Sequence, residues 1–350
     1  MPTPISPVVI RFGRLGDTIL LQPLLHKLHL RYGRPCRALF LGAWSSALYV
    51  GQPDIEQIVT IRSQYGALWA SPQRLRAALA LKGMRGAPFY ICENEPRFST
   101  KVRPMLKLAG IADDQCEFIT SMPHYPDEHQ IDWLTRFGDR TPTAFQAEYG
   151  ATQVEVTAAA RLLVTPTERA DCDAWLKAEG LSGRPLIPLQ PANKRTIRWN
   201  GIRSPGDDDK SWPVENWAAL SRAIVDRIPE AQLLLCGSPD EKDYLETIRA
   251  AAGIPAVRVV AGDLPLPRLK ALLDIAHSMV SVDTGPAHMA AVMGCPLVVL
   301  FGNRLPSMWA PRSPSGSDVT ILGGLPAIRR VCDIELAQVI NAWSDLRPRR

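Results

Sequence analysis

Residues 281–291, SVDTGPAHMAA, are the most informative segment of the chain, because they predict a strand that passes directly into a helix. The apolar run before Asp283 is typical of a buried strand. Asp283 or Thr284 is a natural helix N-cap, and Pro286 suits the first helical turn, where its missing N–H costs nothing. The amides of Thr284 and Gly285 would then lack partners, and such a helix end favours phosphate. On its own, a well-capped helix after a buried strand explains the segment better.

A second strand-to-helix turn lies near the N-terminus, in VVIRFGRLGDT at residues 8–18. Gly13 and Gly16 permit a tight turn and the close approach of a ligand to the backbone. Asp17 follows where strand meets helix, at the carboxyl edge of an expected parallel sheet, which is where such sheets bind ligands. Alone, Asp17 is more readily explained as a helix-capping residue. The turn is neither a dinucleotide fingerprint nor a P-loop, because Gly-x-Gly-x-x-Gly and Gly-Lys-Ser/Thr are both missing.

Two further motifs lie between these segments: DDKSWP at residues 208–213, followed by Trp217, and CGSPDE at residues 236–241. Together with RLGDTILLQPLL at residues 14–25 and DTGPAH at residues 283–288, they run through essentially the whole chain. In this order the four motifs resemble glycosyltransferase family 9, the lipopolysaccharide heptosyltransferases. The resemblance implies the GT-B fold, an α/β architecture of two Rossmann-like domains with parallel sheets that face a central cleft.

Strand-like and helix-like runs alternate along the chain, which also predicts parallel sheets with right-handed crossovers. In the first half we expect strands at 8–12, 38–42, 57–61 and 88–92, helices at 18–32, 72–82 and 100–109, and an edge strand containing Val154 and Val156. In the second half we expect strands at 186–189, 232–236, 257–260, 278–282 and 297–301, and helices at 214–228, 239–252, 265–276, 285–293 and 333–346.

The length of 350 residues is too great for one ordinary core and predicts two domains. We expect an N-terminal acceptor-binding Rossmann-like domain at 1–165, an interdomain linker at 166–182, a C-terminal nucleotide-sugar-binding Rossmann-like domain at 183–332, and a closing helix with a basic tail at 333–350. Seven cysteines without a Cys-x-x-Cys pair argue against a disulfide framework and against zinc. Four of them lie in or beside apolar runs and are expected in the core: Cys36, Cys92, Cys236 and Cys295.

The charge of the chain is unevenly distributed. Residues 1–112 contain 15 Lys/Arg and 5 Asp/Glu, a net of +10, whereas residues 113–180 have a net of −8. A concentrated positive region indicates an anionic partner, and because few aromatic residues are interleaved with it, nucleic acid is disfavoured. A solvated surface balanced by the acidic segment is a nearly equal alternative. The candidate contacts to an anionic lipopolysaccharide core acceptor are Arg14, Arg62, Lys101 and Arg103.

The location of the protein can also be predicted. No apolar run approaches the ~20 residues needed to span a bilayer, and the N-terminus lacks the basic start, apolar stretch and cleavage site of a signal peptide. We therefore expect a cytoplasmic protein, with peripheral contact at the cytoplasmic face of the inner membrane left open.

Sugar transfer requires that an acceptor hydroxyl lose a proton and that a diphosphate leaving group be stabilised. Asp17, at a glycine turn, is placed to accept this proton as a general base, and it matches the base of the family. The family uses no metal or other cofactor, so fixed positive groups must stabilise the leaving diphosphate. By resemblance, Lys210 is directed at the donor phosphates, and the amides of Thr284 and Gly285 form a helix-end cradle for them. Without the adjoining Trp-Pro, Lys210 would be interpreted as a surface lysine.

The remaining donor contacts rest on the resemblance alone. It implies that Glu241 holds the nucleoside, that Asp283 holds sugar hydroxyls and that His288 binds a phosphate. A lone histidine on a helix is more often a packed core residue.

The sequence departs from the family at two places. QPAN at residues 190–193 precedes a long basic stretch, whereas relatives have threonine, serine or a small loop shortly before the lysine. We expect Asn193 to take over the polar role there. FGNRLP at residues 301–306 replaces the usual Gly-Pro-Thr-Asp/Ser-Pro. The affinity for the donor, or its identity, could therefore differ.

These observations lead to one main hypothesis and two alternatives. The main hypothesis is an inverting, metal-independent glycosyltransferase that moves heptose from ADP-heptose to a lipopolysaccharide inner-core acceptor, Kdo or heptose. The first alternative is a member of the same family with another nucleotide-sugar donor. The second is a non-catalytic GT-B protein that binds a glycan or nucleotide, which the joint presence of Asp17, Lys210 and Asp283 disfavours.

Overall fold

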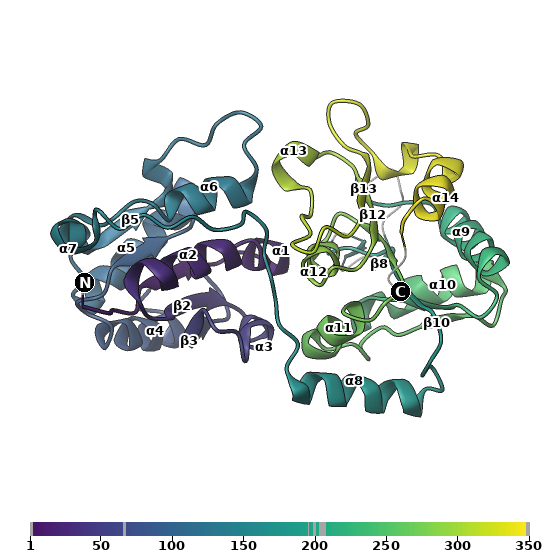
Figure 1. Ribbon diagram of the computed structural model, residues 1–350, viewed down its shortest axis with the longest axis horizontal. Helices are drawn as coiled ribbons and strands as arrows, with labels where there is room; N and C mark the ends of the chain where they lie inside the picture. Colours follow the sequence, from purple (N-terminus) through teal and green to yellow (C-terminus); the bar gives the residue numbers. More distant parts are fainter. Residues whose placement is uncertain (1–2, 66–67, 195, 199–200, 203–207, 348–350) are drawn as a thin grey trace. The chain divides into compact units, whose positions relative to one another are not determined.

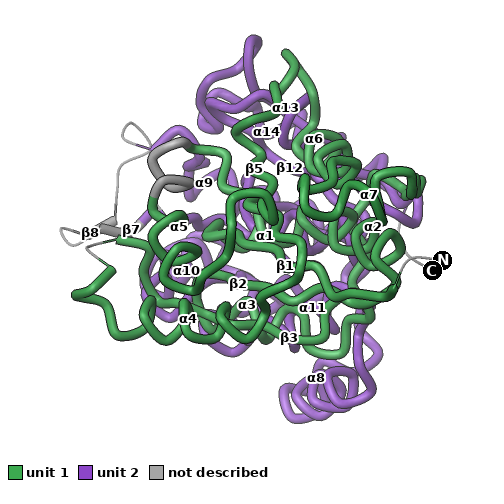
Figure 2. The backbone as a smooth tube through the Cα atoms, turned by 90° about the vertical axis from the view of Figure 1, so that its left-hand side faces the viewer, with its two compact units in different colours: residues 1–162 green, residues 163–350 purple. Residues whose placement is uncertain are grey.

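The computed structural model divides the chain into two compact units, residues 1–162 and residues 163–350 (Figure 2). It describes residues 3–65, 68–194, 196–198, 201–202 and 208–347. Several residues of the basic stretch and tail, among them Arg195, Asp207, Arg349 and Arg350, lie outside the described part. Each unit is described below by itself.

The first unit is built on a parallel sheet with the order β3-β2-β1-β4-β5. Its strands are β1 (Val8–Arg11), β2 (Cys36–Leu41), β3 (Ile55–Ile61), β4 (Phe89–Ile91) and β5 (Cys116–Phe118). The chain builds outward from β1 to β3 and then returns to add β4 on the other side of β1. The strand order therefore reverses between β1 and β4, and such a switch point leaves a crevice at the carboxyl ends of the two strands.

Helices cover both faces of this sheet (Figure 1). They are α1 (Leu15–Ile19), α2 (Gln22–Tyr32), α3 (Trp44–Tyr49), α4 (Pro72–Lys82), α5 (Pro96–Ala109), α6 (Gln130–Phe137) and α7 (Gln146–Tyr149). Helices α4 and α5 pack together on one face, and α2 and α6 pack together on the other. Val8 and Ile10 of β1 join the apolar cluster under α4 and α5, as the alternation of side chains along a strand requires.

The second unit contains a parallel sheet with the order β10-β9-β6-β11-β12-β13. Its strands are β6 (Leu186–Gln190), β9 (Gln232–Leu235), β10 (Val257–Val259), β11 (Met279–Val282), β12 (Leu297–Phe301) and β13 (Val319–Gly323). Here the order reverses between β6 and β11. A short antiparallel hairpin of β7 (Ile197–Arg198) and β8 (Gly201–Ile202) lies in the basic stretch that follows Asn193.

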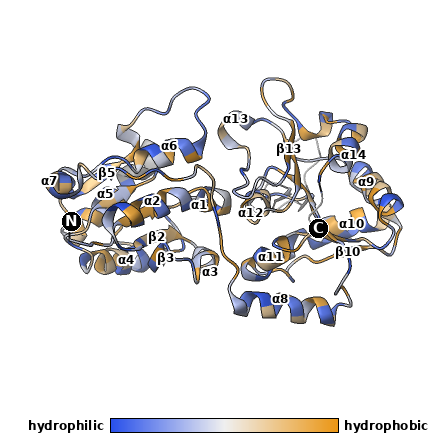
Figure 3. Ribbon diagram, in the orientation of Figure 1, coloured by the Kyte–Doolittle hydropathy of each residue, from blue (hydrophilic) through white to orange (hydrophobic). Residues whose placement is uncertain are grey.

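Helices again cover both faces of the sheet. They are α8 (Pro166–Ala178), α9 (Val214–Arg227), α10 (Lys242–Ala252), α11 (Leu266–Leu273), α12 (Gly285–Val292), α13 (Pro306–Trp309) and α14 (Leu336–Ser344). Helices α9, α10 and α14 pack around the buried Trp217, and α8 and α11 pack on the opposite face around Cys172 and Leu272. Polar and apolar residues alternate along α8, as expected for a helix with one buried side (Figure 3).

The predicted linker at 166–182 is largely helical and belongs to the second unit. Thr165 caps α8 through its hydroxyl, and the Glu168 carboxylate accepts the Thr165 N–H in return, which is a capping box. Glu168 also lies 2.8 Å from Nζ of Lys270 on α11, and the lysine is only 1% exposed. The short capping motif was visible in the sequence, but the buried ion pair that attaches α8 to α11 depends on the tertiary fold.

Two expectations about secondary structure were wrong. The helix predicted at 18–32 is divided into α1 and α2, because Pro23 lies in the first turn of α2 and cannot donate the hydrogen bond that a continuous helix needs. Val154 and Val156 form no strand. The four cysteines expected in the core, Cys36, Cys92, Cys236 and Cys295, are buried with free thiols. No helix in the described part of the chain has both the length and the apolar character of a bilayer-spanning segment.

Candidate active site

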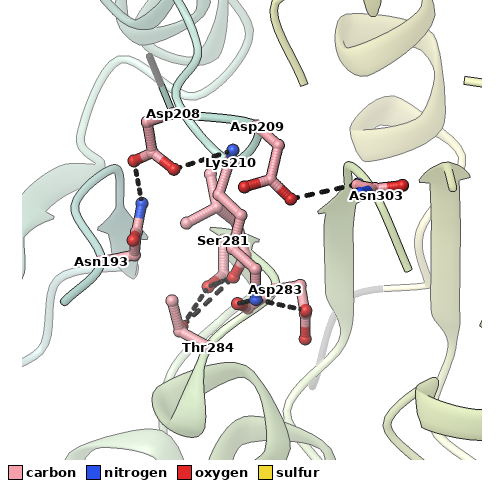
Figure 4. Close-up of polar contacts among 9 residues, drawn as sticks. Asn193, Asp208, Asp209, Lys210, Ser281, Asp283, Thr284 and Asn303 are labelled. Carbon is pink, nitrogen blue, oxygen red and sulfur yellow. Dashed lines mark hydrogen bonds and ion pairs between the residues drawn. The ribbon is translucent and has the colours of Figure 1, made fainter. Parts of the chain in front are cut away.

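The main polar cluster of the second unit lies at the switch point between β6 and β11 (Figure 4). Lys210 Nζ donates to Asp283 Oδ2 at 2.5 Å and to the Asp283 backbone carbonyl at 2.7 Å. The Asp283 N–H in turn donates to Leu300 O at 3.0 Å, continuing the β11–β12 ladder by one residue. The sheet therefore fixes the backbone of Asp283, and Asp283 fixes the ammonium group of Lys210.

A buried aspartate holds the loop that carries Lys210. Asp208 is 1% exposed, and its carboxylate accepts the Lys210 N–H at 3.1 Å and the Asn193 side-chain amide at 2.8 Å. Asn193 follows β6, and its own N–H donates to Thr196 Oγ1 at 2.9 Å. Because a buried carboxylate needs such donors to offset its desolvation, Asn193, Asp208 and Lys210 form one connected unit.

The next residue of the loop, Asp209, is held from the opposite side. Its carboxylate accepts the Asn303 N–H at 3.3 Å, and its backbone carbonyl accepts the Val331 N–H at 2.9 Å. Gly302 packs so closely that an added Cβ would lie 2.1 Å from the Asp209 carbonyl oxygen. The segment FGNRLP, which departs from the family pattern, therefore supports the Lys210 loop directly.

Helix α12 begins beside Lys210 and Asp283. Thr284 is its N-cap by backbone conformation, but its hydroxyl donates to Val282 O at 3.2 Å and does not cap the helix. Within the described residues, no group accepts the N–H of Thr284 or Gly285. These amides thus remain available at the positive end of the helix dipole, where an anion is stabilised.

The two other predicted donor residues are Glu241 and His288. Glu241 follows β9 on a 3₁₀ turn of residues Pro239–Glu241 (η4), and its carboxylate accepts the Ser238 N–H at 2.7 Å. Gly237 permits this approach, since an added Cβ there would lie 2.9 Å from Glu241 Oε2. His288 lies buried on α12. The structure places both on elements at the carboxyl edge of the sheet, and their contacts to nucleoside and phosphate stay predictions.

Asp17 belongs to a separate cluster, at the switch point of the first unit. It is the third residue of α1, and its carboxylate accepts the Arg14 N–H at 2.9 Å and a guanidinium N–H of Arg11 at 3.1 Å. Its side chain is 23% exposed, so the carboxylate caps the helix and still faces solvent. Gly13 is required beside it, because an added Cβ would lie 2.5 Å from Asp17 Cβ.

Sequence reasoning missed two residues next to Asp17. Arg11 ends β1, and its largely buried guanidinium also donates to Cys92 O and, at 3.3 Å, to Asn94 Oδ1. Glu93 follows β4, is 4% exposed and accepts the Phe12 N–H. Burial raises the pKa of Glu93 above that of an ordinary glutamate, although the nearby Arg11 and the Phe12 N–H act to lower it. The available signal was a charged residue at the end of each apolar run.

The predicted acceptor contacts lie at different places on the first unit. Arg14 is exposed at the start of α1, and Arg62 is exposed after β3. The ammonium of Lys101 lies over the ring of Tyr65, 4.6 Å from its centroid, in the loop that follows Arg62. Arg103 instead lies over the Phe118 ring at 4.0 Å and pairs with Asp113. The structure therefore associates Lys101 with the loop after β3, whereas Arg103 faces β5.

No group of three or more His, Cys, Asp or Glu side chains in the described part of the chain is arranged to hold a metal ion. What the two units share is a polar cluster at the switch point of a parallel sheet: a base candidate in the first, and a lysine beside a helix N-terminus in the second. Two such Rossmann-like units define the GT-B class of fold, and solved structures confirm that predicted class.

Comparison with known proteins shows which family the chain is similar to. Residues 177–335 match the model of glycosyltransferase family 9 (heptosyltransferase). The chain is 27% identical over 334 residues to lipopolysaccharide heptosyltransferase 2 of Escherichia coli K12, covering 92% of this chain and 90% of that protein. It is 35% identical over 106 residues to lipopolysaccharide heptosyltransferase 3 of Escherichia coli, a match that spans 31% of that protein. These matches confirm the resemblance to glycosyltransferase family 9 seen in the motifs, and they support a glycosyltransferase activity.

Two solved structures resemble the whole chain. The ADP-heptose LPS heptosyltransferase II of Escherichia coli has a TM-score of 0.73 at 18% identity, covering 97% of this chain and 98% of that one. A family 9 glycosyl transferase from Veillonella parvula has a TM-score of 0.75 at 15% identity, covering 98% of both chains. At these identities the likeness establishes the fold.

Proposed function

We propose that this protein transfers heptose from ADP-heptose to a lipopolysaccharide inner-core acceptor, Kdo or heptose, with inversion at the anomeric carbon and without a metal ion. The observation that carries the proposal is the Lys210–Asp283 pair at the N-terminus of α12. It combines a fixed cation with two free backbone amides, as a diphosphate leaving group requires. The similarity to lipopolysaccharide heptosyltransferases 2 and 3 supports the donor and acceptor classes.

The donor is assigned to the second unit. Lys210 and the amides of Thr284 and Gly285 stabilise the charge that develops on the diphosphate as the glycosidic C–O bond breaks. Asp283, beside the ammonium group, accepts hydrogen bonds from the sugar hydroxyls. Glu241 contacts the nucleoside, and His288 a phosphate. Asn193 acts with Asp208 in supporting the Lys210 loop.

The base is assigned to the first unit. The Asp17 carboxylate takes the proton of the acceptor hydroxyl while that oxygen bonds to the anomeric carbon and the diphosphate leaves with the electron pair of the broken bond. Attack on the face opposite the leaving group inverts the anomeric configuration. Fixed cations replace the charge of a metal ion in this scheme.

The acceptor is assigned to the basic part of the first unit. Residues 1–112 carry a net charge of +10, and Arg14 and Arg62 are both exposed there, which suits the phosphates and carboxylates of an inner core. Trp69 is 82% exposed in the loop that follows Arg62. An exposed tryptophan in the basic unit also supports peripheral contact with the inner membrane, since its ring suits the membrane interface.

A thermal-shift experiment with ADP-heptose and with UDP, GDP and CMP sugars tests the donor. ADP-heptose at 100 times its dissociation constant should add about 2.7 kcal/mol to the free energy of unfolding, and the other sugars should add little. Stabilisation by a UDP sugar alone would favour the alternative donor. Binding of ADP-heptose with no heptose transferred to a core acceptor would favour the non-catalytic alternative.

A further inference from the structure

Glu93 is a buried charged residue that the proposed reaction does not use. It lies two residues beyond β4, at the switch point where β4 runs beside β1. The β1–β4 ladder ends with the Cys92 N–H donating to Ile10 O at 2.9 Å. Beyond that point side chains replace backbone pairing: the Glu93 carboxylate accepts the Phe12 N–H, and the Arg11 guanidinium donates to Cys92 O.

The segment that Glu93 contacts also carries the groups that bind the Asp17 carboxylate. Phe12 is the first residue after β1, and one more residue, Gly13, separates it from Arg14, whose N–H donates to Asp17. Arg11, on the other side of Phe12, donates to the same carboxylate. Both groups that hold Asp17 therefore belong to the short segment that Glu93 fixes through the Phe12 N–H.

We propose that Glu93 is a positioning residue for Asp17: it holds the β1–α1 turn through the Phe12 N–H and, by its negative charge, keeps the Arg11 guanidinium between β4 and Asp17. This inference rests on the proposed function, because it takes Asp17 to be the base. A matching arrangement in the second unit supports it. There Asp283, directly after β11, fixes the Lys210 side chain at the corresponding switch point.

The charge of Glu93 is sensitive to its surroundings. Burial raises its pKa most, and Asp17 and Glu95 raise it further, whereas Arg11 and the Phe12 N–H lower it. Because the net effect is upward, Glu93 takes up a proton at a higher pH than an ordinary glutamate. As pH falls through that range, the negative charge facing Arg11 is lost, and turnover should fall with it.

The test uses Glu93→Ala and Glu93→Gln in the full-length chain. Glu93→Ala leaves the Phe12 N–H without its acceptor, so kcat should fall by about ten- to a hundredfold, as small displacements of catalytic groups do. The dissociation constant for ADP, measured by calorimetry, should stay unchanged because its site is in the second unit. Glu93→Gln keeps an acceptor oxygen and should restore part of kcat. In Glu93→Gln the acid limb of the pH profile of kcat should move to lower pH, since the residue at position 93 can no longer be protonated.

Asp54→Asn serves as the matched control. Asp54 is also a buried carboxylate and is hydrogen-bonded to Gln22, His26 and His29. It lies at the amino ends of the strands, where its backbone carbonyl accepts the Cys36 N–H. The Asp54→Asn substitution should lower thermal stability and leave kcat unchanged. Wild-type kcat in Glu93→Ala would overturn the inference, and so would an equal loss of kcat and ADP affinity.

A double mutant separates this inference from the proposed function. If Glu93 acts through Asp17, Glu93→Ala should cause no further loss of kcat in the Asp17→Asn background. A multiplicative further loss would mean that Glu93 acts independently of Asp17. Wild-type activity in Asp17→Asn alone would instead remove the base assigned in the proposed function.

Discussion

At the scale of single residues, the candidate donor site consists of charges that hold one another in place. Lys210 is fixed by Asp283 through its side chain and by Asp208 through its backbone N–H. An ammonium group held in this way is oriented before the donor arrives, and a group that need not reorganise stabilises developing charge most effectively. Asp17 is fixed in a comparable way, by Arg11 and by the Arg14 N–H.

Removing the Lys210 charge should weaken donor binding. Lys210→Gln should lose about 1.5–3 kcal/mol of binding free energy for the nucleotide sugar, the range for hydrogen bonds to charged groups, and it leaves Asp283 unpaired. Calorimetry with ADP-heptose checks this, with Lys177→Gln, an exposed lysine on α8, as the control. Activity of the wild-type protein should be unchanged by EDTA. A strict requirement for Mg²⁺ or Mn²⁺ would contradict the role given to Lys210.

Removing the Asp17 carboxylate should stop transfer. Asp17→Asn should lower kcat by about 10²–10⁴, as loss of a general base does, while the dissociation constant for ADP stays the same. Steady-state kinetics and calorimetry measure the two effects separately. If the variant keeps more than about a tenth of wild-type turnover, Asp17 serves only as a helix-capping residue. Loss of such a cap costs about 1 kcal/mol of unfolding free energy.

At the scale of secondary-structure elements, both candidate sites depend on where a parallel strand ends. Asn193 follows β6, and Asp283 follows β11. The Asp208–Lys210 loop contacts both of these residues and also the segment after β12. Their positions are set by strand order, since adjacent parallel strands bring their carboxyl ends to one edge. The segment after β12 approaches the loop most closely at Gly302, which packs against the carbonyl of Asp209.

A methyl group at Gly302 should therefore displace the Lys210 loop. The added Cβ would lie 2.1 Å from the Asp209 carbonyl oxygen, a backbone atom that cannot turn aside. Gly302→Ala should cost about 1–3 kcal/mol of unfolding free energy and weaken ADP binding as well. Gly83→Ala is the control, because its Cβ would meet only the Ala80 carbonyl at 3.4 Å. Unchanged ADP affinity in Gly302→Ala would show that the loop position does not matter for the donor.

At the scale of the whole molecule, the two units divide the charge and the proposed tasks between them. The basic residues 1–112 lie within the first unit, and the match to the family model, residues 177–335, lies within the second. The motifs of the second unit were therefore the stronger guide to the family. The assignment of the acceptor to the first unit still rests on charge and on Asp17.

The acceptor assignment predicts a specific kinetic effect. Arg14→Glu and Arg62→Glu should raise the KM for the core acceptor and leave the KM for ADP-heptose unchanged, because both side chains are exposed on the first unit. Added salt should reduce the difference from wild type, since it screens exposed charges. Arg227→Glu, on α9 of the second unit, is the matched control. A loss of ADP-heptose affinity with normal acceptor KM would mean that the two half-sites are reversed.

Much of the architecture could be predicted from the sequence because its signals are local. The helix at 72–82 and the strand at 297–301 have the predicted bounds. The three-residue β5 was missed because it is too short, and too charged at Glu117, to show a period. Arg11 and Glu93 were missed for another reason. Their contacts depend on β1 lying beside β4, although the two strands are about 80 residues apart in the chain.

The most direct test of the proposed function is to incubate the purified protein with ADP-heptose and a heptose-deficient lipopolysaccharide core in EDTA, and to quantify ADP and the acceptor mass. The expected result is one heptose added to each acceptor converted, with an equal amount of ADP released and an inverted anomeric linkage in the product. An acceptor that stays unmodified with ADP-heptose, but gains a sugar from another nucleotide donor or only after a divalent metal is added, would contradict the proposal.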